Sequence, residues 1–402
     1  MSTQPAADAA VTHLIRWLEQ GGAVISPKMH VVDSGNGHRG VFASEDIAQD
    51  EVLLRIPRRR LVTVADARSS DLGRIIEAHT GFQDPNLYMT AFLLGEKERG
   101  EASAWKPFLD IQPQSFPTHP FYFQERELSL LKGSLVVELI AAQRRALEED
   151  YSHLCRKVPG FERFTFAQFL WAHVAVLTRI FGGKVKETKV HCLAPFVDML
   201  NDGIPANAGW GWSEDGEFFE VTADSAIPRG KELRDSYGAH SNAHLLRHYG
   251  FVHEHNPNNE VMVPLEISQT DPLVGEKRAL LGLTDLSARH FFSLPFKPDA
   301  ARIIELFSEL RILQAGPEEL ALLKEAPDAR IRAKVPLSPS NEAQVLLTLS
   351  SACAARLALY ETSVEEDTRL LQDPNLPWND RNCILLRRGE KQCLAVFAQA
   401  GS

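Results

Sequence analysis

The stretch DSYGAHSNAHLLRHYGF, residues 235–251, carries two Tyr-Gly pairs twelve residues apart. Three histidines fall between the pairs at a spacing of four residues: His240, His244 and His248. Two histidines one helical turn apart can share a metal ion. However, the H-E-x-x-H pattern is absent, and Ser241 is a good N-cap for a helix that follows it. We therefore interpret the stretch as a strand end followed by a short helix, and we expect no metal.

Each of the two tyrosines in this stretch lies at the end of a predicted element and directly before a glycine. Tyr237 ends the predicted strand and Tyr249 ends the predicted helix. A short helix that folds back would bring both rings to one pocket, so the stretch points to a site that uses two tyrosines.

Four segments of the chain alternate between strand-like and helical patterns. Residues 30–64 and 190–263 contain short β-branched runs divided by turns, which is typical of strands. Residues from about 66 to 183 and from about 264 onward have helical spacing. A few short strands cannot bury a core alone, so we expect one α+β domain, residues 1–263, with a helical insert at about 66–183. Residues 264–402 are expected to form a separate all-α domain.

Composition narrows the class of protein and of partner. The chain has 402 residues, of which 44% are hydrophobic and 24% charged, as in ordinary soluble globular proteins. Its net charge of −10 argues against nucleic acid as a partner. We see no run of 18 apolar residues and no signal peptide. Five scattered cysteines without C-x-x-C fit a reducing compartment. We expect a cytoplasmic monomer without a membrane span; a nuclear location stays open.

Three motifs place polar groups where a ligand could use them, and each also has a purely structural interpretation. In PFVDMLNDG (195–203), Asp198 and Asn201 lie among apolar residues and need hydrogen-bond partners, from the backbone or from a bound molecule. Arg179, on an otherwise apolar helix, is either a snorkelling side chain or a carboxylate clamp. The Gly-rich loop in GNGHRGVFA (35–43) is either a hairpin or a close approach to a cofactor.

Taken in order, these motifs resemble those of the SET-domain methyltransferases. The matching segments are GHRGVFASEDI, FLWAHVAVLTRIF, APFVDMLND and IPRGKELRDSYGAHSNAHLLRHYGF. They are most similar to the branch of the Rubisco large-subunit lysine methyltransferase, and the tail resembles that branch's helical substrate-binding domain. The resemblance covers almost the whole chain. It implies a SET β-core with a helical insert, a helical C-terminal domain that helps to dock a protein substrate, and S-adenosylmethionine as cofactor.

The resemblance also assigns roles to individual residues. It implies a catalytic role for Tyr237 and for Tyr249, which also lines the target channel together with Phe181. Where the family usually has Asn-His, this chain has Asn201-Asp202, which puts cofactor affinity in question. The residues expected to contact the cofactor are Gly37, His38, Arg39, Thr178, Arg179, Asp198, Asn201, Asp202, Tyr237 and Phe251.

The target atom is predicted from one position. The actin-histidine methyltransferase of this branch has an Asn two residues after the Arg of its T-R-x-N segment, whereas this chain has Phe181 there. A phenyl ring cannot fix an imidazole by hydrogen bonding, but it can line a channel for an aliphatic stem. We therefore expect a protein-lysine N-methyltransferase. The alternatives are a protein-histidine N-methyltransferase and a SET-fold adaptor that binds protein without catalysis.

Overall fold

The computed structural model describes residues 5–33, 39–185, 187–266, 268, 270–283, 289–297 and 300–399. Contacts divide the chain into two compact units. The first unit comprises Met1–Pro117 and Gln143–Ala239, and the second comprises Thr118–Ala142 and His240–Ser402. The expected boundary after residue 263 differs from this division, because strand β12 (Glu260–Glu266) runs across it and belongs to the core of the second unit.

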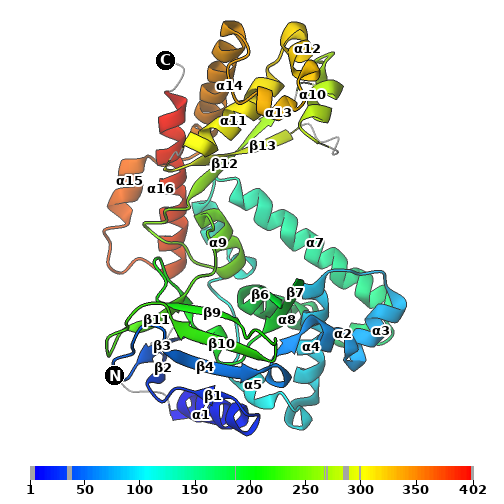
Figure 1. The fold of residues 1–402 in the computed structure, drawn as a ribbon, viewed down its shortest axis with the longest axis vertical. Coiled ribbons are helices and arrows are strands. Elements are labelled where there is room, and N and C mark those ends of the chain that lie inside the picture. Colours follow the sequence, from blue (N-terminus) through cyan, green and yellow to red (C-terminus); the bar gives the residue numbers. More distant parts are fainter. Residues whose placement is uncertain are drawn as a thin grey trace. The chain divides into compact units, whose positions relative to one another are not determined.

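The first unit is built around three small sheets of short strands (Figure 1). The strand orders are β1-β4-β10-β9, β2-β3-β11-β8 and β5-β7-β6. In β10, alternate residues are buried, which is the pattern of a half-buried strand. The strands are β1 (Val24–Ile25), β2 (Met29–Asp33), β3 (Arg39–Ala43), β4 (Val52–Pro57), β5 (Val62–Thr63), β6 (Ile180–Val185), β7 (Thr188–Leu193), β8 (Asn201–Asp202), β9 (Ala208–Trp212), β10 (Phe218–Ala223) and β11 (Glu232–Asp235).

Helices fill the part of the first unit between β5 and β6, as the helical spacing predicted. Helix α8 (Phe166–Arg179) begins with a capping box from Thr165 and Gln168 and buries an apolar face. It packs against α4 (Pro85–Arg99), whose centre is also buried. The other helices are α1 (Pro5–Gln20), α2 (Val64–Ser69), α3 (Asp71–His79), α5 (Lys106–Asp110) and α7 (Val136–Lys157), whose first residues belong to the second unit.

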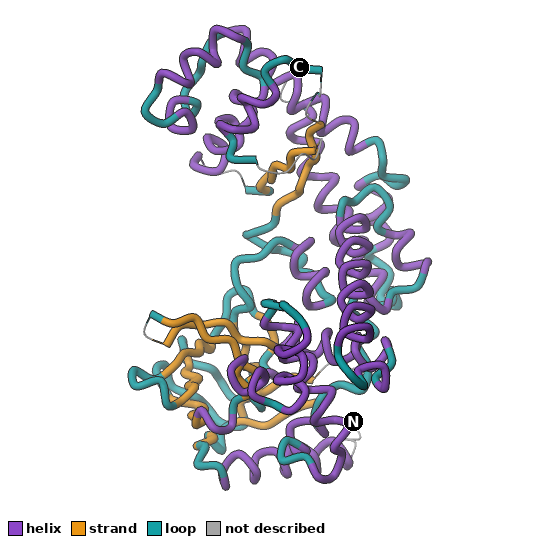
Figure 2. Tube along the Cα trace, turned by 90° about the vertical axis from the view of Figure 1, so that its right-hand side faces the viewer, coloured by secondary structure: helices purple, strands orange, loops and turns teal. Residues whose placement is uncertain are grey.

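The second unit is mostly helical, with one sheet of two strands. In β12 and β13 (Arg289–Pro295), Val261, Val263, Phe292 and Leu294 point into a core shared with helices. Figure 2 shows this strand pair among the helices of the unit. The helices are α6 (Glu125–Leu130), α9 (Asn242–Tyr249), α10 (Val274–Leu280), α11 (Ala300–Leu313), α12 (Pro317–Glu325), α13 (Ala329–Arg332), α14 (Pro339–Leu357), α15 (Val364–Leu370) and α16 (Trp378–Ala398).

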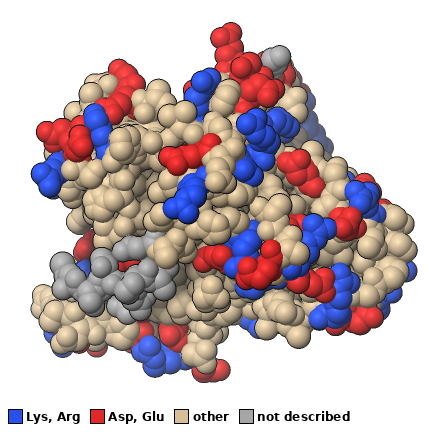
Figure 3. Space-filling model, turned by 90° about the horizontal axis from the view of Figure 1, so that it is seen from below, with Lys and Arg blue, Asp and Glu red and all other residues tan. Residues whose placement is uncertain are grey.

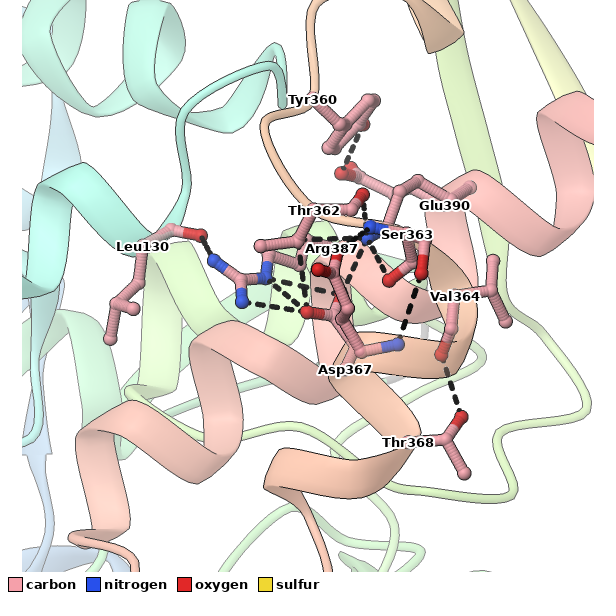
Figure 4. Close-up of polar contacts among 11 residues, drawn as sticks. Leu130, Tyr360, Thr362, Ser363, Val364, Asp367, Thr368, Arg387 and Glu390 are labelled. Carbon is pink, nitrogen blue, oxygen red and sulfur yellow. Dashed lines mark hydrogen bonds and ion pairs between the residues drawn. The ribbon is translucent and has the colours of Figure 1, made fainter.

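A buried charged cluster ties α15 and α16 together in the second unit (Figure 4). The Asp367 side chain is 0% exposed and accepts from the guanidinium of Arg387, with Nη2 at 2.6 Å. Nζ of Lys391 lies 2.7 Å from the same carboxylate and donates to two main-chain oxygens. Arg387 also donates to the main-chain oxygen of Leu130, so the cluster joins the chain before α7 to α16. With these partners the buried charges are compensated.

Surface charge is mixed in sign. Figure 3 shows Lys and Arg side chains interspersed with Asp and Glu on the face drawn. Within the described residues, every helix is too short or too polar to cross a membrane.

Candidate active site

An arginine and an aspartate meet where α8 ends. Arg179, in the last turn of α8, donates from Nη1 to the main-chain oxygen of Asp198 at 2.7 Å and lies 3.3 Å from its Oδ2. The same Oδ2 accepts from Nε2 of Gln112 at 3.0 Å. The Asp198 side chain is 0% exposed and that of Arg179 is 17% exposed. The pair therefore fixes the short 3₁₀ helix η5 (Val197–Met199) against the end of α8.

Two atoms of this pair keep unused hydrogen-bonding capacity. Oδ1 of Asp198 and Nε of Arg179 are buried, and neither has a partner among the described residues. Buried polar groups in native proteins are nearly always hydrogen-bonded. The arrangement thus offers one acceptor and one donor to a small polar ligand.

Arg39 brings a second cation to the same place. Its Nη2 donates to the main-chain oxygen of Ile111 at 2.6 Å. Burial, together with the nearby Arg179 guanidinium, lowers the pKa of Arg39 below its ordinary value, while Asp198 acts in the opposite direction. Two guanidinium groups therefore lie around one buried carboxylate, a setting that favours a further anionic group.

The backbone before η5 is strained. Phe196 has a φ of 74°, a region that non-glycine residues seldom adopt, and its ring is buried. Strained backbone of this kind is kept only where the surrounding packing holds it in place, and it is most frequent at functional sites.

Asn201 connects the β8 strand to the start of β3. Its Nδ2 donates to the main-chain oxygen of Arg39 at 3.0 Å and to Oε1 of Glu232 at 2.8 Å. A Cβ on Gly40 would lie 2.5 Å from the Glu232 carboxylate and 3.0 Å from Nδ2 of Asn201. Only glycine allows the close approach here. Two residues of the expected cofactor loop, Gly37 and His38, lie outside the described residues.

Tyr237 is held at two points by the segment that contains β8. Its backbone N–H donates to Oδ1 of Asp202 at 2.8 Å, and its hydroxyl donates to the main-chain oxygen of Leu200 at 2.9 Å. Because β8 and β11 pair in parallel, the chain leaving β11 passes directly beside this segment. The tyrosine ring is therefore oriented by the neighbouring strand.

Two further residues of this unit were predicted to contact the cofactor or the target, and each has a contact within the protein that accounts for its side chain. Oγ1 of Thr178 donates to the main-chain oxygen of Val174 within α8 at 2.8 Å. Phe181 packs edge-to-face on Trp210, with ring centroids 5.2 Å apart, and lies 5.5 Å from the ring of Phe219. Packing in this aromatic cluster is sufficient reason for a phenyl ring at position 181.

Tyr249 and Phe251 belong to the second unit. Tyr249 is the last residue of α9, and Gly250, with a φ of 82°, caps the helix. The rings of Tyr249 and Phe251 lie 6.1 Å apart, and the ring of His244 lies 6.4 Å from that of Tyr249. The structure thus brings these two predicted residues together within their own unit.

The three histidines of the 235–251 stretch form a stack. The ring centroids of His240 and His244 are 3.9 Å apart, as are those of His244 and His248. Burial, followed by the neighbouring histidines, lowers the pKa of His244 to about 3, and burial also lowers the pKa of His248. Over the described parts of the chain, no set of three or more His, Cys, Asp or Glu side chains is arranged to hold a metal ion.

Sequence reasoning missed one residue of the site, Gln112, and it also missed the buried Asp235 near the site. No local signal marks Gln112, since it reaches Asp198 from 86 residues earlier in the chain. Asp235 did carry a signal. It lies two residues after the buried Leu233 along β11, so the period of a strand places both side chains on the same, buried face.

Comparisons with known proteins agree with this architecture. Residues 268–394 match the family described as Rubisco LSMT substrate-binding. The SET domain of LSMT, solved with lysine and AdoHcy, superposes with a TM-score of 0.82 at 23% identity, covering 98% of this chain and 91% of that one. Rubisco LSMT solved with AdoMet gives a TM-score of 0.80 at 23% identity, with 97% and 90% covered.

Curated relatives include the actin-histidine N-methyltransferases of Rattus norvegicus and Homo sapiens. Each is 27% identical to this chain over 402 residues, which cover 95% of the chain and 66% of the relative. The chain therefore spans just under two thirds of the length of these relatives.

The fold and the arrangement around Arg179, Asp198 and Tyr237 define a SET-fold protein. Its fold is similar to that of LSMT, and its C-terminal residues 268–394 match the Rubisco LSMT substrate-binding family. The fold class expected from the sequence is confirmed, with the β12–β13 pair as an addition to the helical domain.

Proposed function

We propose that this protein is an S-adenosylmethionine-dependent protein N-methyltransferase. The observation that carries the proposal is the convergence of Arg179, Asp198, Asn201 and Tyr237 around β8 and η5, in a chain with the fold of LSMT solved with AdoHcy. The cytoplasmic location and the monomeric state stay predictions; the five cysteines, all free, are compatible with a reducing compartment.

The unused atoms of the arginine–aspartate pair fit the cofactor's methionine end. That end carries an ammonium group and a carboxylate, which need an acceptor and a donor. Oδ1 of Asp198 is a buried acceptor without a partner in the described chain, and Nε of Arg179 is such a donor. Arg39 adds positive charge beside them. These residues, with Asn201, would hold the cofactor, which supplies a methyl group on a positively charged sulfur.

The protein's own task is to present a neutral nitrogen in line with that methyl group. Correct positioning of two reactants can supply roughly 7–11 kcal/mol of the barrier. A lysine amine with a pKa of about 10.4 must first lose a proton, at a cost of about 4–5 kcal/mol near pH 7, whereas an imidazole is largely neutral there. The Tyr237 hydroxyl, fixed through Leu200, is a rigid group that can orient either nitrogen without competing as a nucleophile.

One observation favours histidine as the target, and a second weakens the argument for lysine. Relatives aligned over 95% of the chain are named actin-histidine N-methyltransferases. In addition, the lysine prediction depended on Phe181, whose ring is accounted for by its packing against Trp210 and Phe219. Histidine, in actin or a similar protein, is therefore our first candidate. Lysine, which is bound together with AdoHcy in a solved structure of the LSMT SET domain, is the second.

A protein rather than a small molecule is the proposed substrate, because residues 268–394 match a substrate-binding family. The experiment that tests the target is methylation of purified actin and of whole-cell protein extract, followed by tandem mass spectrometry. Methyl groups on an imidazole nitrogen would support the first candidate. Methyl groups on Nε of lysine alone would replace it with the second, and methylation of neither residue would refute the proposal.

A further inference from the structure

Gln112 is a buried polar residue beside the arginine–aspartate pair of the site. It lies in the turn that follows α5, where its N–H donates to the main-chain oxygen of Leu109 at 3.1 Å. The residue is 4% exposed, and its Nε2 donates to Oδ2 of Asp198 at 3.0 Å. Burying an amide costs free energy unless it is hydrogen-bonded, so the contact with Asp198 offsets the cost of burying the glutamine. The contact also acts on Asp198, whose carboxylate faces the proposed cofactor site.

Three consecutive residues, Ile111, Gln112 and Pro113, are each bound by a different element of the first unit. The main-chain oxygen of Ile111 accepts from Nη2 of Arg39 in β3 at 2.6 Å. The main-chain oxygen of Pro113 accepts from Nε1 of Trp171 in α8 at 2.8 Å. The backbone on both sides of Gln112 is therefore held in place, and its amide reaches η5 from a fixed position.

Arg179 and Asp198 are joined through one carboxylate oxygen rather than two. An arginine and a carboxylate frequently pair through two parallel hydrogen bonds, one to each oxygen. Here Nη1 of Arg179 lies 3.3 Å from Oδ2, while Nε of Arg179 and Oδ1 of Asp198 are buried without a partner among the described residues. Gln112 donates to the same Oδ2, so one oxygen receives both contacts and the other stays free.

We propose that Gln112 is a positioning residue of the cofactor site. By holding Oδ2 of Asp198, it prevents a two-point pair with Arg179 and keeps Oδ1 and Nε available for the amino-acid end of S-adenosylmethionine. The inference rests on the proposed function, because the ammonium and carboxylate of that cofactor are the groups that these two atoms would meet. Without Gln112, the carboxylate turns toward the guanidinium, and the two unused atoms become partners of each other.

The test compares two ligands on the native protein and on Gln112→Met, whose side chain has a similar length but no donor. AdoHcy, the demethylated cofactor, has the amino-acid end, whereas 5′-methylthioadenosine has the adenosine and the sulfur but neither ammonium nor carboxylate. Calorimetry measures the first affinity and ligand-observed NMR the second. We expect Gln112→Met to bind AdoHcy at least about tenfold more weakly, the equivalent of one hydrogen bond to a charged group. Its affinity for 5′-methylthioadenosine should be unchanged.

Two further variants make the comparison specific. The matched control is Gln83→Met, because Gln83 is an exposed glutamine of the same unit whose amide donates to the nearby main-chain oxygen of Gly81. That variant should bind both ligands as the native protein does. Gln112→Asn keeps the amide on a side chain that is one methylene shorter, so it should show the same selective loss of AdoHcy.

The outcomes separate the role of Gln112 from the proposed function. Equal weakening of both ligands in the Gln112 variants would show that the residue only supports the fold, and unchanged AdoHcy binding would equally overturn the positioning role. In both cases, binding of AdoHcy by the native protein leaves the proposed function standing. If the native protein binds neither AdoHcy nor S-adenosylmethionine, the proposed function fails, and the inference that rests on it fails too.

Discussion

Nη1 of Arg179 lies 2.7 Å from the main-chain oxygen of Asp198 and 3.3 Å from its carboxylate, so the end of one helix holds the segment that leads into β8. This contact joins residues from two sequence motifs, and both also have unused polar atoms. The pair therefore stabilises the fold and has capacity left for a ligand, and its removal is expected to affect both properties.

Arg179→Ala should destabilise the protein and weaken cofactor binding. Removing the cation leaves the Asp198 carboxylate buried with a hydrogen bond from Gln112 and with Arg39 as the nearby cation. Breaking a buried ion pair costs about 3–5 kcal/mol. Urea unfolding measures the first effect and calorimetry with S-adenosylmethionine the second. The matched control is Arg55→Ala, which removes a more exposed pair with Glu220 and should cost about 1 kcal/mol or less. Equal losses in the two variants would contradict the account.

Asp367→Asn should destabilise the second unit. The change leaves Arg387 and Lys391 buried without their anion, so we expect a loss of about 3–5 kcal/mol in the free energy of unfolding. The control is Lys132→Ala, since Lys132 and its partner Glu361 are both more than 60% exposed. That variant should lie within about 1 kcal/mol of the native protein. Calorimetric unfolding measures both, and an unchanged transition in Asp367→Asn would show that the cluster is not a stabilising element.

Acid should destabilise the protein through His244. Its pKa is about 3 in the folded state and about 6.5 in the unfolded state. Between these values the unfolded chain binds more protons, so stability falls as the pH drops below about 6.5. His244→Phe keeps an aromatic ring in the stack but does not titrate, and its unfolding free energy should fall less steeply with acid. Parallel curves for the two proteins would show that the stacked histidine is not a source of the pH dependence.

Cofactor binding separates an enzyme from an adaptor that has lost its cofactor site. A ligand at 100 times its Kd adds about 2.7 kcal/mol to the stability of the protein that binds it. We expect saturating S-adenosylmethionine, and also its demethylated product, to raise the melting temperature. The rise should be smaller in Asn201→Ala, because Nδ2 of Asn201 joins β8 to Arg39. A melting temperature insensitive to both compounds would favour the adaptor.

The helices and strands were largely predictable from the sequence, because periodicity reports which face of an element is buried. The meeting of Arg179 and Asp198 followed from family resemblance; spacing alone does not show that α8 ends beside η5. Gln112 was not predictable, since its partner is distant in sequence. The boundary between the compact units lies earlier in the chain than the one expected after residue 263. Val261 and Val263 on β12 pack into a core formed with later helices and therefore belong to the second unit.

The most direct test of the central claim is transfer of an isotopically labelled methyl group from S-adenosylmethionine to protein in a cell extract. Tyr237→Phe is the control, because it removes only the hydroxyl that donates to Leu200, a hydrogen bond worth about 1 kcal/mol. The account predicts labelled protein with the native enzyme, and a rate lower by roughly a hundredfold or more with Tyr237→Phe, although that variant still binds the cofactor. No labelling by the native protein, or equal labelling by both, would contradict it.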